Sequence, residues 1–223
     1  MVENEAAGMH LPGLSQGFLP MPVARLFRAP PVSESTIKPG ARERVLEAAY
    51  ELFSRDSIAS VGVDAIVQHS GVAKMSFYKH FPSKDDLILA FLDLRDTRWT
   101  AGWLEAEASR RGNTPTERLL AMFDAFDDWF RLRDFAGCPL VRTVTEVPQG
   151  TPIHTAAAHA LASARKLIKR FATEAGLAEP EVFAKTWHSL LKGSIVSAVE
   201  GDRSVAKQVR RGAVLILDGW PRG

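Results

Sequence analysis

The sequence has few of the features that would assign it to a membrane or disulfide-bonded class. Its 223 residues include a single cysteine, Cys138, so no disulfide can form within the chain and a cysteine-rich zinc site is excluded. No apolar run approaches the ~20 residues of a membrane span, and the first five residues lack the basic start of a secretory signal. We therefore expect a cytoplasmic protein with no membrane contact.

An excess of charge of one sign is also missing. The chain has 28 Lys and Arg residues against 26 Asp and Glu, which leaves a formal charge of +2. This balance does not identify a nucleic-acid-binding protein, so any DNA surface has to come from the placement of charge. The hydrophobic fraction of 46% and the charged fraction of 24% are ordinary for a globular protein and exclude a disordered or fibrous chain.

The first 39 residues differ in composition from the rest of the chain. They hold three glycines and a large share of the 13 prolines, namely Pro12, Pro20, Pro22, Pro30, Pro31 and Pro39. This density of helix-breaking residues leaves no helical or strand periodicity. We expect residues 1–39 to form a flexible arm.

From residue 40 onwards, apolar residues recur at spacings of three and four, which predicts an all-α fold of about nine helices. Local signals place several helix starts. Ser83 with Asp86, and Thr114 with Glu117, are spaced as in capping boxes, and Asp202 is expected to cap the last helix. The fourth helix is expected to run from Ser83 to about residue 110.

The segment Val63–His80 predicts two short helices joined by a tight turn. Gly71 lies in this turn, where a positive φ is needed. This is the helix-turn-helix layout, in which the second helix can enter the major groove of DNA. The stretch Ala65–Lys84 contains no acidic residue, whereas Lys74 and Lys79 lie within it. That local excess of positive charge suits a phosphate backbone.

Three stretches, Arg44–Phe53, Val63–Ile66 and Gly71–Leu87, resemble the DNA-binding domain of the tetracycline-repressor (TetR) family of bacterial transcription regulators. The resemblance covers about residues 41–90. It implies a three-helix DNA-binding domain over residues 40–99, with the helix-turn-helix at about 62–81. A helical ligand-binding and dimerisation domain is expected to follow over residues 100–223. Family members commonly have Gly at the positions of Ser57 and Met75, so the operator sequence cannot be transferred.

The resemblance also implies roles for individual residues. Lys, Met and Ser at the start of the recognition helix are expected to face base edges, and the Tyr and Lys residues that follow are expected to contact phosphates. The expected DNA-binding residues are Lys74, Met75, Ser76, Tyr78, Lys79 and Lys84.

A pocket for a small, mainly apolar ligand is expected in the C-terminal domain, between aromatic helices. The candidate lining residues are Phe123, Phe126, Phe130, Thr143, His154, Trp187 and His188. No charged side chain is expected inside. Asp124, Asp127, Asp128 and Arg131 fall on the opposite face of their helix, where we expect a solvated surface with one ion pair. Cys138 is expected to be a small buried residue, and the alternative is a redox-sensing thiol, which needs exposure and a lowered pKa.

Together these features predict a sequence-specific DNA-binding regulator that acts without metal or cofactor. We expect a repressor, released from a double-stranded DNA operator by a small-molecule inducer, and a homodimer formed through the last two helices. Two alternatives remain. One is a helical protein-interaction module that has lost DNA binding, with Ser57 and Met75 as its signs. The other is an α-helical enzyme, but paired carboxylates, a phosphate-binding glycine loop and metal-ligand spacing are all missing from the sequence, so no enzyme is expected.

Overall fold

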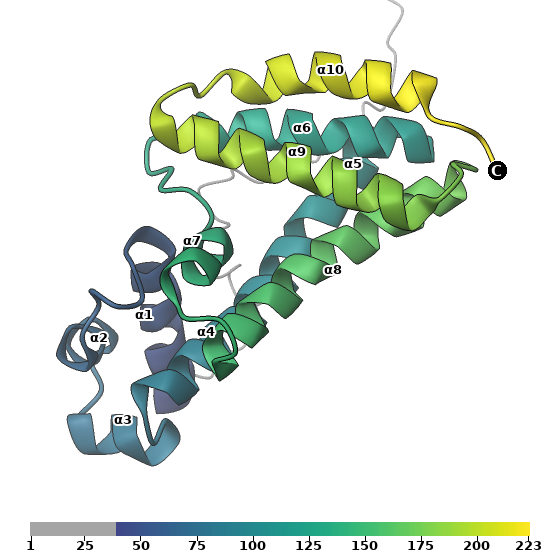
Figure 1. The fold of residues 1–223 in the computed structure, drawn as a ribbon. Coiled ribbons are helices and arrows are strands. Elements are labelled where there is room, and N and C mark those ends of the chain that lie inside the picture. Colours follow the sequence, from purple (N-terminus) through teal and green to yellow (C-terminus); the bar gives the residue numbers. More distant parts are fainter. Residues whose placement is uncertain (1–38) are drawn as a thin grey trace, which may run out of the picture.

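The structure is a computed structural model that describes residues 39–223, and its elements in this range are helices (Figure 1). The described part contains no strand, only an isolated antiparallel bridge between Leu177 and Arg222. The predicted all-α class is confirmed. The arm expected at residues 1–39 lies outside the described residues, apart from its last residue.

The helices follow one another with short connections. In chain order they are α1 (Ala41–Arg55), α2 (Val63–Ser70), α3 (Lys74–His80), α4 (Lys84–Asp96), η2 (Thr97–Glu105), α5 (Ala106–Arg111), α6 (Pro115–Phe130), α7 (Pro139–Glu146), α8 (Pro152–Glu174), α9 (Pro180–Glu200) and α10 (Val205–Gly219). The π-helical segment η2 joins α4 to α5 without a break, so residues 84–111 form one rod. Counted in this way, residues 39–223 form nine helices, as predicted.

The helix starts follow the local signals in the sequence. The Ser83 hydroxyl accepts a hydrogen bond from the Asp86 backbone N–H at 3.1 Å, and the Asp86 carboxylate accepts one from the Ser83 backbone N–H at 3.0 Å. Thr114 and Glu117 make the same reciprocal pair. The last helix differs: Ser204 occupies the N-cap position, and Asp202 lies two residues earlier, where it accepts a hydrogen bond from the Ser204 N–H.

The helices are arranged at two ends of a long diagonal (Figure 1). Helices α1, α2 and α3 contact one another at one end, and α6, α9 and α10 lie at the other. The rod 84–111 and α8 pack side by side and connect the two ends. The buried apolar side chains of both ends belong to a single cluster that extends from Val45 to Leu217. A displacement of the rod can therefore reach both ends.

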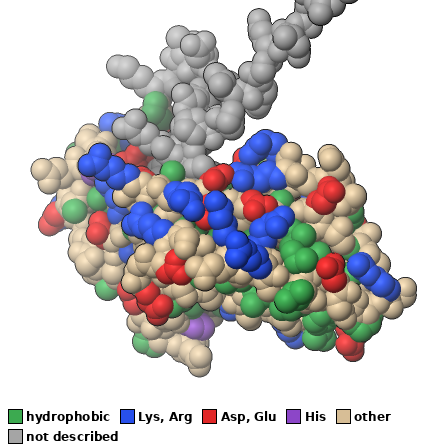
Figure 2. All heavy atoms as spheres, turned by 90° about the horizontal axis from the view of Figure 1, so that it is seen from above, with side chains coloured by type: hydrophobic (Ala, Val, Ile, Leu, Met, Phe, Trp, Pro, Cys, Tyr) green, Lys and Arg blue, Asp and Glu red, His purple; other side chains and the backbone are tan. Residues whose placement is uncertain are grey.

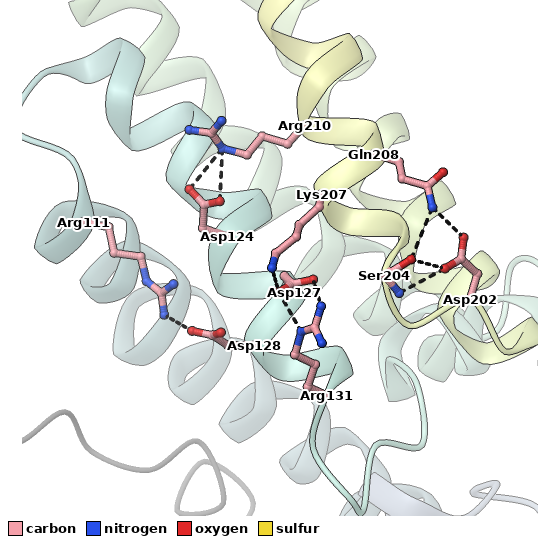
Figure 3. Close-up of polar contacts among 10 residues, drawn as sticks. All are labelled: Arg111, Asp124, Asp127, Asp128, Arg131, Asp202, Ser204, Lys207, Gln208 and Arg210. Atoms are coloured by element: carbon pink, nitrogen blue, oxygen red, sulfur yellow. Dashed lines mark hydrogen bonds and ion pairs between the residues drawn. The ribbon is translucent and has the colours of Figure 1, made fainter.

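A polar seam joins α6 to α10 (Figure 3). Arg210 Nε lies 3.1 Å from a carboxylate oxygen of Asp124. The Asp127 carboxylate lies 2.8 Å from Arg131 Nε and 3.4 Å from Lys207 Nζ, and Asp127 is only 4% exposed. The prediction of a solvated face was thus wrong for Asp127, which α10 covers, whereas the Asp124 side chain is still 40% exposed.

Seen from the α10 side, Lys and Arg side chains gather over the surface, with Asp and Glu among them (Figure 2). This face lies away from α3 (Figure 1). Each helix among residues 39–223 is too short or too polar to cross a lipid bilayer.

Candidate DNA-binding surface and ligand cavity

The turn between α2 and α3 has the geometry of a helix-turn-helix. Gly71 has φ 61° and ψ 27°, the left-handed conformation in which a Cβ is disfavoured, as the sequence predicted. The Ser70 hydroxyl donates to the Val67 carbonyl at 3.0 Å and accepts from the Val72 backbone N–H at 3.3 Å. Phe77 of α3 is fully buried, which fixes the rotation of α3 about its own axis.

This rotation directs the other side chains of α3 outward. Lys74, Met75, Tyr78 and Lys79 are exposed, and Ser76 is half-buried. Met75 is 83% exposed and Tyr78 is 44% exposed, although most large apolar side chains of a folded protein are buried. The exposed face of α3 therefore combines two cations, a long thioether and a phenol.

Lys74 has a partner in this conformation. Its ammonium lies 2.6 Å from a carboxylate oxygen of Asp64 at the start of α2. The hydrogen bond from Lys74 to Asp64, together with the negative charge of Asp64, raises the pKa of Lys74. Both side chains are more than half exposed, so the pair is weak and can be exchanged for a base or a phosphate.

Lys84 occupies the first position of α4, directly after the Ser83 cap. It is half-buried, and this burial lowers its pKa, an effect that the nearby Asp85 opposes. The backbone N–H groups of the first turn of a helix also favour an anion. A cation in this position therefore lies beside a helix end that also attracts phosphate.

Comparison with known proteins shows which family shares this arrangement. Residues 45–91 match the model of bacterial regulatory proteins of the tetR family. A TetR-family transcriptional regulator from Streptomyces coelicolor is 26% identical and superposes with a TM-score of 0.72, over 80% of this chain and 94% of that one. A tetR transcriptional regulator from Streptomyces avermitilis is 28% identical, with a TM-score of 0.66, over 78% and 98%. This chain belongs to the TetR family.

Similarity in sequence is confined to shorter stretches. The transcriptional activator FasR of Mycolicibacterium smegmatis is 34% identical over 88 residues, which are 40% of this chain and 39% of FasR. Among the curated relatives, the matched stretches span between 38% and 54% of the relative's own length. The curated relatives that these stretches match are transcription regulators of the helix-turn-helix type.

A cavity lies between the rod 84–111 and helices α6, α7, α8 and α9 of this TetR-family chain. It is lined by Trp99, Thr100, Leu104, Phe126, Cys138, Leu140, Ala160, Leu161, Ala164, His188, Leu191, Lys192 and Ile195. Its volume is about 20 Å³, room for about one water molecule. A larger ligand can enter only if lining side chains move.

Two of the predicted pocket residues, Phe126 and His188, line this cavity, and the other five do not. Phe123 and Trp187 are fully buried and pack edge to face on each other, with ring centroids 5.3 Å apart. Phe130 is fully buried between aromatic neighbours, and Thr143 is also buried. His154 is half-buried near the start of α8, where its backbone N–H donates to the Thr151 hydroxyl.

The sequence analysis did not place several lining residues at the pocket. Trp99, Thr100 and Leu104 come from the π-helical segment η2. Lys192 is a charged lining residue where none was expected, although it lies one helical turn after His188 on α9 and could have been assigned to the same face. Cys138 is buried, at the N-cap position of α7. Among residues 39–223, no three His, Cys, Asp or Glu residues are grouped so that they could hold a metal ion.

Burial keeps His188 neutral. Removal from water lowers the pKa of its imidazole to about 3, and the positive charges of Lys192 and Arg165 act in the same direction. The His188 side chain is 4% exposed, and its Nδ1 atom has no hydrogen-bond partner among the described residues. An unsatisfied polar atom beside a cavity is a site where a ligand can form a hydrogen bond.

Two sets of contacts join the cavity walls to α1. In the first, Arg95 and Arg98 reach Tyr50 and Glu47, respectively. In the second, α7 begins at the cavity with Cys138 and then contacts the C-terminal end of α1. Arg142 of α7 donates to the backbone carbonyls of Arg55, at 2.9 Å, and Ser54, at 3.3 Å. A cation near the last carbonyls of a helix is favourable.

Ser57, one of the departures from the family pattern, takes part in the second set. Its hydroxyl donates to a carboxylate oxygen of Glu146 at 2.6 Å. The residue that suggested a loss of function therefore connects the loop after α1 to α7. This contact explains Ser57 structurally, so Ser57 is not evidence that DNA binding has been lost.

Proposed function

We propose that this TetR-family regulator is a repressor that binds a double-stranded DNA operator and is released from it by a small, mainly apolar ligand. The observation that carries the proposal is the position of the exposed large hydrophobic side chains. In the described part of the chain they are confined to α3, with Met75 and Tyr78, and to the last two helices. Each group is available to a partner outside the chain itself.

On α3 the proposed partner is the major groove of DNA. Lys74, Met75 and Ser76 at the start of the helix face base edges: Lys donates to guanine, Met contacts a thymine methyl group and Ser accepts several bases. Tyr78, Lys79 and Lys84 contact phosphates. Support comes from the outward direction of these side chains and from the acid-free stretch that surrounds them.

On the last two helices the proposed partner is a second copy of the chain. Val182, Val196 and Val199 of α9 and Leu215 of α10 are exposed. A Cβ atom added at Gly193 would meet nothing within 4 Å, so another helix can approach α9 closely there. A dimer of this kind presents two recognition helices to two half-sites of an operator.

The cavity is too small for the proposed ligand unless its lining side chains move, and the proposed mechanism follows from this. Because a ligand has to move lining side chains, it binds better to a conformation in which the walls have shifted, and it stabilises that conformation. The walls include η2 and the start of α7, both of which contact α1. Ligand binding is proposed to change the distance between the two recognition helices and so to lower operator affinity.

The domain organisation proposed for this role is a DNA-binding domain over residues 40–99 and a ligand-binding and dimerisation domain over 100–223. A regulator of chromosomal genes acts where the DNA is, so the proposed location is the cytoplasm. It is proposed to have no catalytic activity of its own.

A gel shift with the DNA upstream of the chain's own gene tests the proposal. We expect a shifted band that survives an excess of unrelated DNA, and a change in transcription from that promoter when the gene is deleted. An increase in transcription on deletion supports a repressor, whereas a decrease indicates an activator, the role given in the name of the relative FasR. Absence of any shift at low salt would instead favour a protein-interaction module.

A further inference from the structure

The cavity opens between α8 and α9. Among its lining residues, only Leu161 of α8 and Lys192 of α9 are partly exposed, and all others are buried. These two side chains therefore form the mouth. Behind them lie apolar walls made by the aromatic rings of Trp99 and Phe126 and by Leu140.

Each side of the mouth carries a cation. Lys192 lies one helical turn after His188, which also lines the cavity. Arg165 lies one helical turn after Leu161 on α8, so it shares the face of α8 that borders the opening. Within residues 39–223, neither Lys192 nor Arg165 forms an ion pair or a side-chain hydrogen bond. Both charges are nevertheless close enough to act on the His188 imidazole.

His188 is a third polar group at this opening. Its Nδ1 atom is buried and has no partner in the described part of the chain. A neutral imidazole has one N–H donor and one acceptor nitrogen, so it can serve a polar ligand group from inside the mouth. A purely apolar ligand would leave Nδ1 buried and unpaired, whereas a ligand with a polar end can give it a hydrogen bond.

We propose that the cavity binds a small organic acid, with an aromatic or aliphatic body inside and a single carboxylate at the mouth between Lys192 and Arg165. The carboxylate accepts charge-assisted hydrogen bonds from the two cations, which are stronger than neutral ones. The inference rests on the proposed function only in taking this acid as the effector of the regulator. It makes the ligand mainly apolar, as proposed above, but with a negative charge at one end.

The small volume of the free cavity is compatible with this ligand. The two mouth residues, Leu161 and Lys192, are partly exposed and can swing towards solvent. A lysine can keep its ammonium group at the surface while its apolar stem lies along the ligand. Entry of the acid therefore widens the cavity from its mouth.

Calorimetric titration of the full chain with matched ligands tests the proposal. The probes are phenylacetate and octanoate, each compared with its neutral amide, phenylacetamide or octanamide. We expect at least one acid to bind, at least tenfold more tightly than its amide. Lys192→Met is expected to weaken the acid at least tenfold and to leave the amide within twofold. Lys192→Arg keeps the charge and is expected to keep the preference for the acid.

Lys185→Met is the matched control, because Lys185 is an exposed lysine on the same helix that does not line the cavity. It is expected to leave binding of the acid unchanged. Thermal melting followed by circular dichroism verifies that each variant is folded. The ligand class would be wrong if neither acid binds, or if the amides bind as tightly as the acids. It would also be wrong if Lys192→Met and Lys185→Met lose affinity for the acid equally.

The titration contains no DNA, so its outcome is separate from that of the proposed function. A chain that binds the acids but shifts no DNA overturns the regulator and keeps the ligand class. A chain that shifts its operator but shows no preference for acids overturns the ligand class alone.

Discussion

The guanidinium carbon of Arg95 lies 4.4 Å from the centre of the Trp99 ring, where the cavity wall meets the first helix. Trp99 lines the cavity, and Arg95 donates from Nη1 to the Tyr50 hydroxyl of α1 at 3.2 Å. Arg98, from the same segment as Trp99, holds Glu47 of α1 with two hydrogen bonds of 2.8 and 3.2 Å. Side chains in direct contact therefore join the wall of the cavity to a helix of the DNA-binding part.

Arg98→Gln is expected to weaken communication between ligand and DNA. It removes the bidentate pair with Glu47, and changes along such a contact path alter coupling by about 0.5–2 kcal/mol. We expect the ligand-induced loss of operator affinity to shrink about twofold to thirtyfold, while operator affinity without ligand changes little. Fluorescence anisotropy of labelled operator, with and without ligand, measures both quantities.

Arg110→Gln is the control for this prediction. Arg110 pairs with Glu107 within the same continuous helix and touches no residue of α1. An equal loss of ligand response in both variants would show that the Arg98–Glu47 pair carries no specific coupling.

Lys84→Met and Tyr78→Phe are expected to weaken operator binding without changing its sequence preference. Each removes one proposed phosphate contact, and a phosphate contact contributes affinity that falls with salt. For Lys84→Met we expect the slope of log affinity against log salt to become shallower by about one. Lys166→Met, an exposed lysine of α8, serves as the control. Wild-type affinity and slope in both variants would contradict the assignments.

Leu215→Glu is expected to separate the proposed dimer. Leu215 is 75% exposed on α10, and a carboxylate buried in an apolar interface costs several kcal/mol. Sedimentation at micromolar concentration should give the mass of a dimer for the wild type and of a monomer for the variant. Thr155→Glu adds the same charge to exposed α8 and should leave the mass unchanged. A wild-type chain that is a monomer would rule out the interface.

The helix boundaries were predictable from the sequence because their causes are local. Ser83 with Asp86 and Thr114 with Glu117 satisfy backbone groups within four residues of each other, so no tertiary information is needed to place them. Gly71 is of the same kind, since its left-handed conformation belongs to the turn itself.

The cavity was harder to predict because it depends on how helices face one another. A period of 3.6 residues assigns faces of an α-helix, but the π-helical segment η2 changes this register, so Trp99 and Thr100 could not be placed at the cavity. The prediction for Asp127 of α6 was wrong for a related reason. The pattern shows that Asp127 lies opposite the aromatic face but not that α10 covers it.

Asp127→Asn is expected to destabilise the fold more than the neighbouring change Asp128→Asn. Burial alone would raise the pKa of Asp127, but the hydrogen bond from Arg131 and the charges of Arg131 and Lys207 outweigh it, so the pKa lies below its usual value. We expect a loss of about 1–3 kcal/mol, because hydrogen bonds to a buried charge are strong. Asp128 is half exposed and pairs with Arg111, and its loss should cost less than about 1 kcal/mol.

Urea unfolding as a function of pH provides a second measurement on Asp127. A carboxyl group with a lowered pKa stabilises the folded state above its ordinary pKa, and this contribution disappears as the pH falls through the folded value. The difference in stability between wild type and Asp127→Asn should therefore shrink below about pH 4. A difference that does not change with pH would mean that the charge of Asp127 is not responsible.

His188→Phe is expected to make stability less sensitive to mild acid. In the folded chain burial lowers the pKa of His188 to about 3, whereas the unfolded chain has the ordinary value of 6.5. Between these values the unfolded state binds a proton that the folded state does not, so the stability of the wild type falls as the pH drops below 6.5. From pH 7 to pH 5 this amounts to about 2 kcal/mol. In urea unfolding, the free energy of unfolding of His188→Phe should therefore fall by about 2 kcal/mol less over this pH range than that of the wild type. Equal losses in both proteins would mean that His188 takes up its proton in the folded state, and the cavity would then hold a third positive charge at acidic pH.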